Sequence, residues 1–340
     1  MALSSSIVPV SMIRIGVIGY GYWGPNIVRN LVSLPRVTVS WVSDINPTTL
    51  RTIPRLYPTI RVTQNTSDVF DDPKTDAVII VTPPSTHFPL ALKALKAKKH
   101  VLVEKPMTTS PKDAAKLIAL AARNKKILMV DHTFVYTPAI MQLKKIIQSG
   151  TLGEIRSVDS VRTNLGLFQK DSNVISDLAV HDFSIMDYLF RLTPTSISAT
   201  GLTDGSLKQE TVAYVSTHYG KRVFLHTHVS WLSPIKIRRM IFVGTKKMAV
   251  YDDMEPSEKI KIYDKSVSVT KELRVGYRSG AAFVPRLGTE EALSGLVREF
   301  TRAIVSGKQP RTDGTQGFLV VRCIEAATKS LRSGGKSIRL

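Results

Sequence analysis

An apolar run that ends in a glycine-rich turn is the feature that most constrains this chain. Ile13–Ile18 leads directly into Gly19-Tyr-Gly21-Tyr-Trp-Gly24, and a helical pattern begins at Pro25. A short apolar run with such a boundary is typical of a buried strand, and glycines at these spacings allow a tight turn and a close helix–strand contact. The amino end of the helix would direct its unpaired N–H groups toward bound phosphates. The segment predicts the opening of a dinucleotide-binding domain.

Strand and helix patterns alternate after this turn. Strands are expected at 37–45, 76–82, 101–104 and 127–131, and helices at 25–34, 85–98 and 111–124. Strands separated by helices imply a parallel, doubly wound sheet, so the expected fold class is α/β with an amino-terminal Rossmann domain. We assign residues 12–132 to this domain and expect residues 1–11 to be flexible.

The remainder of the chain, residues 133–340, has a different texture. Strand patterns follow one another at hairpin spacing, with helices expected at 138–149, 177–190, 290–306 and 315–332. This order predicts an α/β domain with a large, open, mainly antiparallel sheet that carries helices on one face. The other face needs a cover, and a partner subunit is the simplest one. Residues 272–288 are expected to be mobile.

Composition narrows the possible functions. The single cysteine, Cys323, excludes an intramolecular disulfide framework, and the histidines show no metal-binding spacing, so no metal is expected. No apolar run approaches the roughly 20 residues that span a bilayer, and the first residues lack a signal-peptide pattern, so we expect a cytoplasmic protein with no membrane contact. The net charge of +20 favours anionic partners. Because the basic residues are scattered and form no nucleic-acid motif, a small acidic substrate is expected rather than nucleic acid. A basic surface with no specific role is the alternative.

An acidic residue at the end of the second strand points to the cofactor. Asp44 lies about 20 residues beyond Gly24, where a carboxylate can accept hydrogen bonds from the adenosine ribose. It would repel a 2′-phosphate, so NAD is favoured over NADP, although Arg51 and Arg55 leave NADP open. The backbone at Tyr22 and Trp23 can contact the pyrophosphate, while their side chains can equally be packing residues.

Two later segments end strands at the edge where doubly wound sheets bind ligands. Thr82 and Pro83 can meet the cofactor ribose, and His87 either contacts the cofactor or caps the helix expected at 85–98. Glu104-Lys105-Pro106 ends another strand, and a charged pair there is costly unless it is used or paired. Lys105 can favour the alkoxide of a reacting hydroxyl, and Glu104 can orient Lys105 or touch the nicotinamide ribose. A surface ion pair is the alternative for Glu104 and Lys105.

Asp177 and His181 supply a candidate acid–base pair. They lie one helical turn apart and therefore on one face of the expected helix. His181 is a natural general base, because its reference pKa lies near neutrality, and Asp177 can orient it. The alternative is an N-terminal cap at Asp177 with a core histidine behind it. Asp182 and Asp187 in the same helix are expected on the surface.

These motifs, in this order and spacing, resemble the glucose–fructose oxidoreductase, inositol dehydrogenase and MocA family. The resemblance rests on Gly19–Gly24, Glu104-Lys105-Pro106 and the Asp177…His181 helix, and it extends from about Ile13 to Gly335. It implies a Rossmann domain followed by an α/β domain whose open sheet mediates homodimers or homotetramers. It also implies a catalytic set of Lys105, His181 and Asp177, in which His181 exchanges the hydroxyl proton while the nicotinamide takes the hydride.

Further motifs resemble the branch of this family that holds nucleotide-sugar 3-dehydrogenases, which oxidise the 3-hydroxyl of UDP-N-acetylglucosaminuronate. They are Gly19–Asn26, Arg162–Gly166, His228–Pro234 and Lys246–Asp253. The branch implies an anionic nucleotide sugar as substrate. Candidate contacts are Asn164 and Trp231 for the sugar and Arg162, Arg238 and Arg239 for an anionic group, although each side chain can instead belong to a solvated strand face. The chain departs from the branch at Asp131, where a small residue is expected.

Two other functions remain open from the sequence. Within the same family, the substrate can be a free sugar or inositol. In a different class, the chain can be a catalytically silent NAD-binding sensor or interaction protein. Silent members are expected to lose the lysine or the histidine, and this chain keeps both Lys105 and His181.

Overall fold

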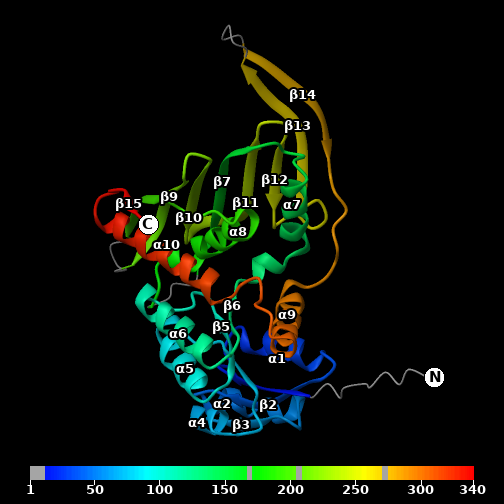
Figure 1. Cartoon of the computed structure of the whole chain (residues 1–340), viewed down its shortest axis with the longest axis vertical. Helices are drawn as coiled ribbons and strands as arrows, with labels where there is room; N and C mark the ends of the chain where they lie inside the picture. The colour runs from blue at the N-terminus through cyan, green and yellow to red at the C-terminus, as the bar shows by residue number, and fades with distance from the viewer. Residues whose placement is uncertain (1–11, 167–170, 204–208, 270–274) are drawn as a thin grey trace, which may run out of the picture. The chain divides into compact units, whose positions relative to one another are not determined.

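The computed structural model describes residues 12–166, 171–203, 209–269 and 275–340 (Figure 1). The chain divides into two compact units, and both are discontinuous. Unit 1 takes the described residues up to Glu104 together with Lys116–Asp131 and Leu293–Pro310, and unit 2 takes Lys105–Ala115, His132–Ala292 and Arg311–Leu340. The segment predicted to be flexible, residues 1–11, lies outside the described residues.

Unit 1 is built on a six-stranded parallel sheet in the order β3-β2-β1-β4-β5-β6, which confirms the predicted Rossmann fold. Its central strands are apolar because helices cover both faces of such a sheet. The strands are β1 (Ile13–Ile18), β2 (Val37–Ser43), β3 (Arg61–Thr63), β4 (Ala77–Ile80), β5 (His100–Glu104) and β6 (Leu128–Asp131). The helices are α1 (Gly24–Val32), α2 (Pro47–Leu50), α3 (Ile53–Leu56), α4 (Thr66–Phe70), α5 (Pro84–Lys96) and α6 (Pro111–Arg123), and most of α9 (Ala292–Ser306) joins this unit.

The strand order reverses direction at β1. The chain runs outward from β1 through β2 to β3 and then returns to β4 on the other side of β1. Doubly wound sheets bind ligands outside the carboxyl ends of the strands at such a reversal. The glycine turn follows β1 and Thr82 follows β4, so both lie at this point.

Unit 2 contains a nine-stranded sheet in the order β14-β13-β12-β11-β7-β10-β9-β8-β15. Neighbouring strands are antiparallel except β10 and β7, which confirms the predicted mainly antiparallel sheet. The strands are β7 (Ile155–Leu165), β8 (Ser196–Thr203), β9 (Glu210–Tyr219), β10 (Val223–Ser230), β11 (Leu232–Gly244), β12 (Met248–Asp252), β13 (Ile260–Val269), β14 (Val275–Phe283) and β15 (Ile338–Arg339).

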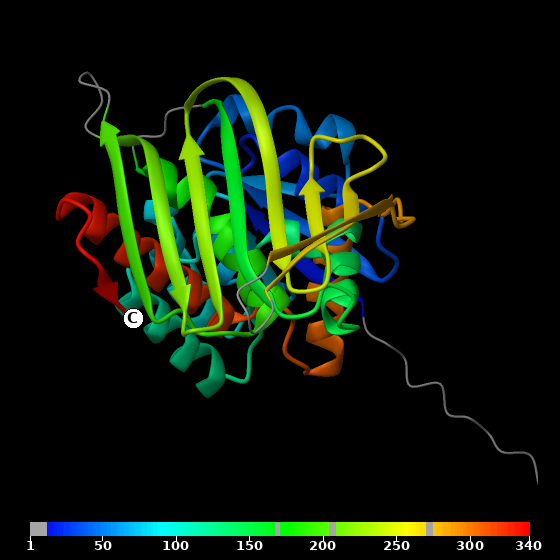
Figure 2. The ribbon, with the colours of Figure 1, turned by 90° about the horizontal axis from the view of Figure 1, so that it is seen from above.

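The helices of unit 2 gather on one face of this sheet. Figure 2 shows its strands in front of the green and red helices α8 (Val180–Phe190) and α10 (Gly314–Arg332). The other helical segments are η1 (Thr133–Tyr136), α7 (Pro138–Gln148) and the π-helical turn η2 (Ile175–Ala179). Among the described residues, no helix is long and apolar enough to cross a membrane.

The segment predicted to be mobile, residues 272–288, contains a strand that the sequence did not predict. Residues 270–274 lie outside the described part, but β14 pairs with β13 from Val275 to Phe283. The described side chains from Gly276 to Phe283 are all exposed. A strand without a buried face shows no alternation of apolar and polar residues, which is the signal that sequence analysis uses.

His100 connects the starts of β5 and β6. Its Nδ1 accepts a hydrogen bond of 3.0 Å from the backbone N–H of Ile127. Burial and the nearby Lys126 ammonium lower the pKa of His100 from 6.5 to about 4. The folded state therefore favours the neutral ring, and its stabilisation is complete above the unfolded pKa and is lost as the pH falls toward 4.

We predict that His100→Asn reduces the acid sensitivity of the fold. Asparagine can still accept from Ile127 but does not titrate, so the melting temperature should fall less between about pH 7 and about pH 5 than in the wild type. The exposed His218 on β9 supplies the control, since His218→Asn should keep the wild-type pH dependence. Equal losses in all three proteins would contradict this account.

Candidate functional site

In the glycine turn, Gly19 and Gly24 have no room for a side chain, whereas Gly21 does. Gly19 has a φ of +95°, and a Cβ there would lie 2.6 Å from the Val81 carbonyl oxygen. A Cβ on Gly24 would lie 2.7 Å from the Gly19 carbonyl oxygen. A Cβ on Gly21 would meet no atom within 4 Å. Packing therefore does not explain Gly21, whereas close approach of a ligand to its backbone would.

Asp44 braces this turn from the end of β2. Its Oδ2 accepts from the Tyr20 N–H at 2.6 Å, and its Oδ1 accepts from the Asn46 N–H at 2.8 Å. The carboxylate is thus fixed beside the turn, where the sequence expects the adenosine ribose. Tyr22 and Trp23 point outward, with 79% and 45% of their surface exposed, so packing inside the protein does not account for either side chain.

Side-chain hydrogen bonds connect the residues that follow β4. The hydroxyl oxygens of Thr82 and Thr86 lie 2.6 Å apart. Nε2 of His87 lies 2.7 Å from the Thr82 carbonyl oxygen. His87 is completely buried. It therefore holds the turn that carries Thr82 and Pro83.

At the next two strand ends, Glu104 of β5 lies in register with the buried Asp131 of β6.

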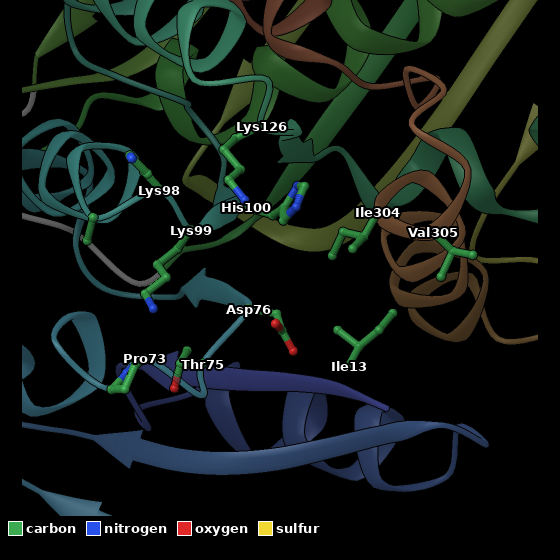
Figure 3. Close-up of a pocket in the computed structure, with 11 residues that line it drawn as sticks. Ile13, Pro73, Thr75, Asp76, Lys98, Lys99, His100, Lys126, Ile304 and Val305 are labelled. Carbon is green, nitrogen blue, oxygen red and sulfur yellow. The ribbon is translucent and has the colours of Figure 1, made fainter. Parts of the chain in front are cut away.

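A cavity of about 500 Å³ in unit 1 lies at the opposite edge of the sheet. Figure 3 shows Lys98, Lys99, His100 and Lys126 around it, facing Ile304 of α9. These lysines follow the carboxyl ends of α5 and α6, where cations offset the helix dipole. Because the amino ends of β1, β4 and β5 border this cavity, we do not assign it to the cofactor.

The predicted acid–base residues lie together in unit 2. The Lys105 ammonium forms an ion pair of 2.9 Å with Asp177 Oδ1 and also donates to the Asp177 carbonyl oxygen at 3.0 Å. The other carboxylate oxygen, Oδ2, accepts from the indole N–H of Trp231 at 3.0 Å. Burial alone would raise the pKa of Asp177, but Lys105 and the hydrogen bond from Trp231 lower it below its usual range.

Asp177 does not cap its helix. Asn173 and Ser176 form the reciprocal hydrogen bonds of a capping box, in which each backbone N–H donates to the other's side-chain oxygen at 3.0 Å. Asp177 lies inside η2, the π-helical turn that precedes α8. Such turns are rare and occur frequently at functional sites. Its side chain is therefore committed to Lys105 and Trp231.

His181 lies at the start of α8 against the ring of Phe134, with ring centroids 4.7 Å apart. Its Nδ1 is buried and has no hydrogen-bond partner among the described residues. Burial, followed by the positive charges of Lys105 and Arg162, lowers the pKa of His181 well below 6.5. The imidazole is therefore neutral near pH 7 and able to accept a proton.

The prediction that Asp182 and Asp187 are surface residues is wrong. Asp182 is completely buried and pairs with Arg162, whose Nε lies 2.5 Å from Oδ1, and Asp187 is only 8% exposed. Every residue of α8 and of the preceding turn η2 is buried or partly buried, so helical periodicity gave no solvated face to find. Arg162 is itself 1% exposed, and its guanidinium stacks on the ring of Phe134. It therefore contacts the site from the buried side.

Neighbouring arginines on β11 point to opposite faces of the sheet. Arg238 lies opposite Arg162 in the register of β11 with β7, on the face that carries the helices. It donates to the Asn164 side chain and, at 3.0 Å, to the Thr163 carbonyl oxygen, and it has no carboxylate partner among the described residues. Burial and Arg162 lower the pKa of Arg238 to about 10. Arg239 lies on the other face and pairs with Asp252 at 2.8 Å.

Two residues that sequence reasoning missed also belong to this cluster. Phe134 lies between His181 and Arg162, and His132 is completely buried, with neither ring nitrogen bonded to a described residue. Burial and Lys105 lower the pKa of His132 to about 3. The sequence motif around these residues carried no chemical signal of its own.

No group of three metal-ligating side chains occurs in the described part of the chain.

Known proteins resemble this chain over nearly its whole length. A myo-inositol 2-dehydrogenase of Thermotoga maritima is 24% identical over 334 residues, which cover 96% of this chain and 98% of that protein. The solved UDP-N-acetylglucosamine 3-dehydrogenase GnnA from Acidithiobacillus ferrooxidans has a TM-score of 0.81 at 24% identity, covering 94% of this chain and 98% of its own. GenD2 from gentamicin A biosynthesis, solved in complex with NAD, has a TM-score of 0.83 at 22% identity, covering 97% of each chain. The two structures share the fold.

Family comparison agrees for both parts of the chain. Residues 13–132 match the oxidoreductase family with an NAD-binding Rossmann fold. Residues 140–250 match the carboxy-terminal domain of the GFO/IDH/MocA proteins. The glycine turn, the braced Asp44 and the open space at Gly21 fit the dinucleotide that the first match names. The chain belongs to the GFO/IDH/MocA family of NAD-binding oxidoreductases.

Proposed function

We propose that this protein is an NAD-dependent sugar dehydrogenase. Its proposed substrate is a nucleotide-linked N-acetylhexosaminuronate, which it oxidises at the C3 hydroxyl. The observation that carries the proposal is the placement of Lys105, Asp177 and His181 in one unit, with an ammonium and a neutral imidazole close enough for the charge of Lys105 to lower the pKa of His181. The 3-hydroxyl is favoured by the branch motifs and by the structural similarity to GnnA, which is named as a UDP-N-acetylglucosamine 3-dehydrogenase.

Each residue has one task in this chemistry. His181 takes the hydroxyl proton, and because Nδ1 is buried, Nε2 is the nitrogen that meets the substrate. The Lys105 ammonium stabilises the negative charge that grows on the oxygen as the proton leaves, and Asp177 holds that ammonium in place. The C–H bond breaks as the C=O bond forms. Bound NAD would supply the hydride acceptor, and the residues that would hold it are Gly19, Gly21, Gly24 and Asp44.

Arg238 favours an anionic substrate over a neutral one. Its guanidinium is partly buried opposite a second arginine, and it forms no direct ion pair with a carboxylate among the described residues, although the charges of Asp182, Asp177 and Asp253 act on it from nearby. Like charges opposite each other on a sheet are destabilising, so a retained pair of this kind calls for a counter-charge. A substrate carboxylate or phosphate would supply it, with Asn164 available for a sugar hydroxyl.

The alternatives differ in what they ask of these residues. A free-sugar or inositol dehydrogenase, as the name of the Thermotoga relative suggests, would use Lys105 and His181 but not Arg238. A silent NAD-binding protein would use neither set.

We also propose that a second copy of the chain covers the sheet face that carries Tyr214 and Ile241, whose exposed fractions are 46% and 37%.

We predict that Gly21→Ala separates cofactor binding from folding. A Cβ at this position meets no protein atom, so the melting temperature should change little, while the dissociation constant for NADH should rise about 10-fold or more because the methyl group crowds the pyrophosphate. Gly24→Ala should lower the melting temperature, since its Cβ collides with the Gly19 carbonyl. Wild-type NADH affinity in Gly21→Ala would contradict the assignment.

We predict that Lys105→Met and His181→Asn each lower kcat at least about 100-fold, in line with the contribution of general acid–base catalysis. NADH formation would be followed with a panel of UDP-linked uronates, UDP-linked hexosamines, free sugars and inositol. The control variant His218→Asn changes an exposed side chain on β9 and should keep wild-type turnover. Retained turnover in both site variants would overturn the catalytic assignment.

We predict that Arg238→Met weakens binding of anionic substrates selectively. The KM for a nucleotide-linked uronate should rise about 30-fold or more, the cost of removing one partner of a buried charge pair. The KM for a neutral sugar should change little. Arg239→Met is the matched comparison, because the neighbouring side chain lies on the other sheet face and pairs with Asp252. An equal effect on charged and neutral substrates would reject Arg238 as the anion contact.

A further inference from the structure

Trp231 is the second partner of the Asp177 carboxylate. Lys105 occupies Oδ1 at 2.9 Å, and the Trp231 indole N–H occupies Oδ2 at 3.0 Å. The indole therefore fixes the rotation of the carboxylate, which one ion pair to a flexible lysine would leave undetermined. The sequence assigned Trp231 to substrate binding, but its side chain is only 1% exposed.

The backbone fixes the indole in turn. Trp231 lies between β10 and β11, where its N–H donates to the Thr211 carbonyl at 2.9 Å and its carbonyl accepts from the Gly166 N–H at 2.9 Å. A Cβ on Gly166 would lie 2.5 Å from Cδ1 of the indole. The chain thus uses a glycine at the end of β7 to make room for this ring. These backbone hydrogen bonds hold the main chain of Trp231, and the missing side chain of Gly166 leaves room for the indole.

We propose that Trp231 is a positioning residue for the hydride-transfer site, whose indole N–H sets the orientation of Asp177 and through it the place of the Lys105 ammonium, and that it does not contact the substrate. This inference rests on the proposed function of Lys105. The charged groups that face Asp177 are Lys105, from the segment after β5, and Arg238, from β11. Both are cations, so losing the indole donor leaves them as the groups that keep Asp177 ionised.

The kinetic test compares Trp231→Phe with the wild type. A hydrogen bond to a charged group is commonly worth about 10- to 100-fold in an equilibrium or rate, so kcat should fall by about that factor. The KM should change less than about 3-fold. The acid limb of the pH profile of kcat/KM should move to higher pH, because Asp177 is protonated more easily without the indole donor. A rise in KM at unchanged kcat would instead make Trp231 a substrate contact and overturn the proposal.

Two further variants separate the hydrogen bond from packing. Replacing Trp231 site-specifically with 3-benzothienylalanine keeps the bicyclic shape but removes the N–H, and the same fall in kcat and shift of the acid limb are expected. Trp41 is the matched control, because its indole N–H also donates to a carboxylate, Asp72 Oδ2 at 2.8 Å, within unit 1. Trp41→Phe should leave the pH profile unchanged. A benzothienylalanine variant with wild-type kinetics would overturn the proposal.

A measurement without turnover distinguishes this inference from the proposed function. The protein has three tryptophans, and in the ¹⁵N-indole-labelled protein the signal of Trp231 is assigned by its loss in Trp231→Phe. Its indole proton shift should titrate with the Asp177 carboxyl group, and Lys105→Met should move that titration to higher pH. A titrating signal in a protein that oxidises no sugar would reject the function but keep the contact. A signal that does not respond to pH would reject the contact itself.

Discussion

The ion pair between Lys105 and Asp177 is the interaction on which the rest of the site depends. It joins residues 72 positions apart, and the two side chains are only 17% and 20% exposed. Burying such a pair costs desolvation, and apolar replacements are often no less stable. Stability alone therefore does not explain why the chain keeps it. The pair holds one ammonium at a fixed place, with a carbonyl oxygen and an indole completing the arrangement.

A second buried pair gives His181 its electrostatic surroundings. Arg162 and Asp182 are 1% and 0% exposed, and the guanidinium reaches toward His181 across the ring of Phe134. Asp182 balances the charge of Arg162, as Asp177 balances that of Lys105. Arg238 is left as the cation without a described carboxylate partner. Burial first, and then this surplus of positive charge, lower the pKa of His181 and favour its neutral form.

Sequence patterns predicted the positions of the catalytic candidates better than their partners. The spacing of Asp177 and His181 implied one helical face, and the end of an apolar strand marked Lys105. The π-helical turn at Asp177 has no recognised sequence signal, and nothing local links Asp182 to Arg162 on another element. Sequence analysis missed the strand β14 for a different reason. Its described side chains are exposed, and hydrophobic periodicity reports only a difference between a buried and an exposed face.

The two arginines of β11 show what tertiary structure adds. Alternation along a strand already places Arg238 and Arg239 on opposite faces. Only the register with β7 decides which of them faces the helices, since Arg238 lies opposite Arg162 and Arg239 lies opposite Val161. Under the proposed function, that assignment would link substrate charge to catalysis. Because Arg238 is one of the cations that lower the pKa of His181, an anion that binds Arg238 would offset this effect and raise the basicity of the imidazole. Substrate binding and proton acceptance would then be coupled through one guanidinium.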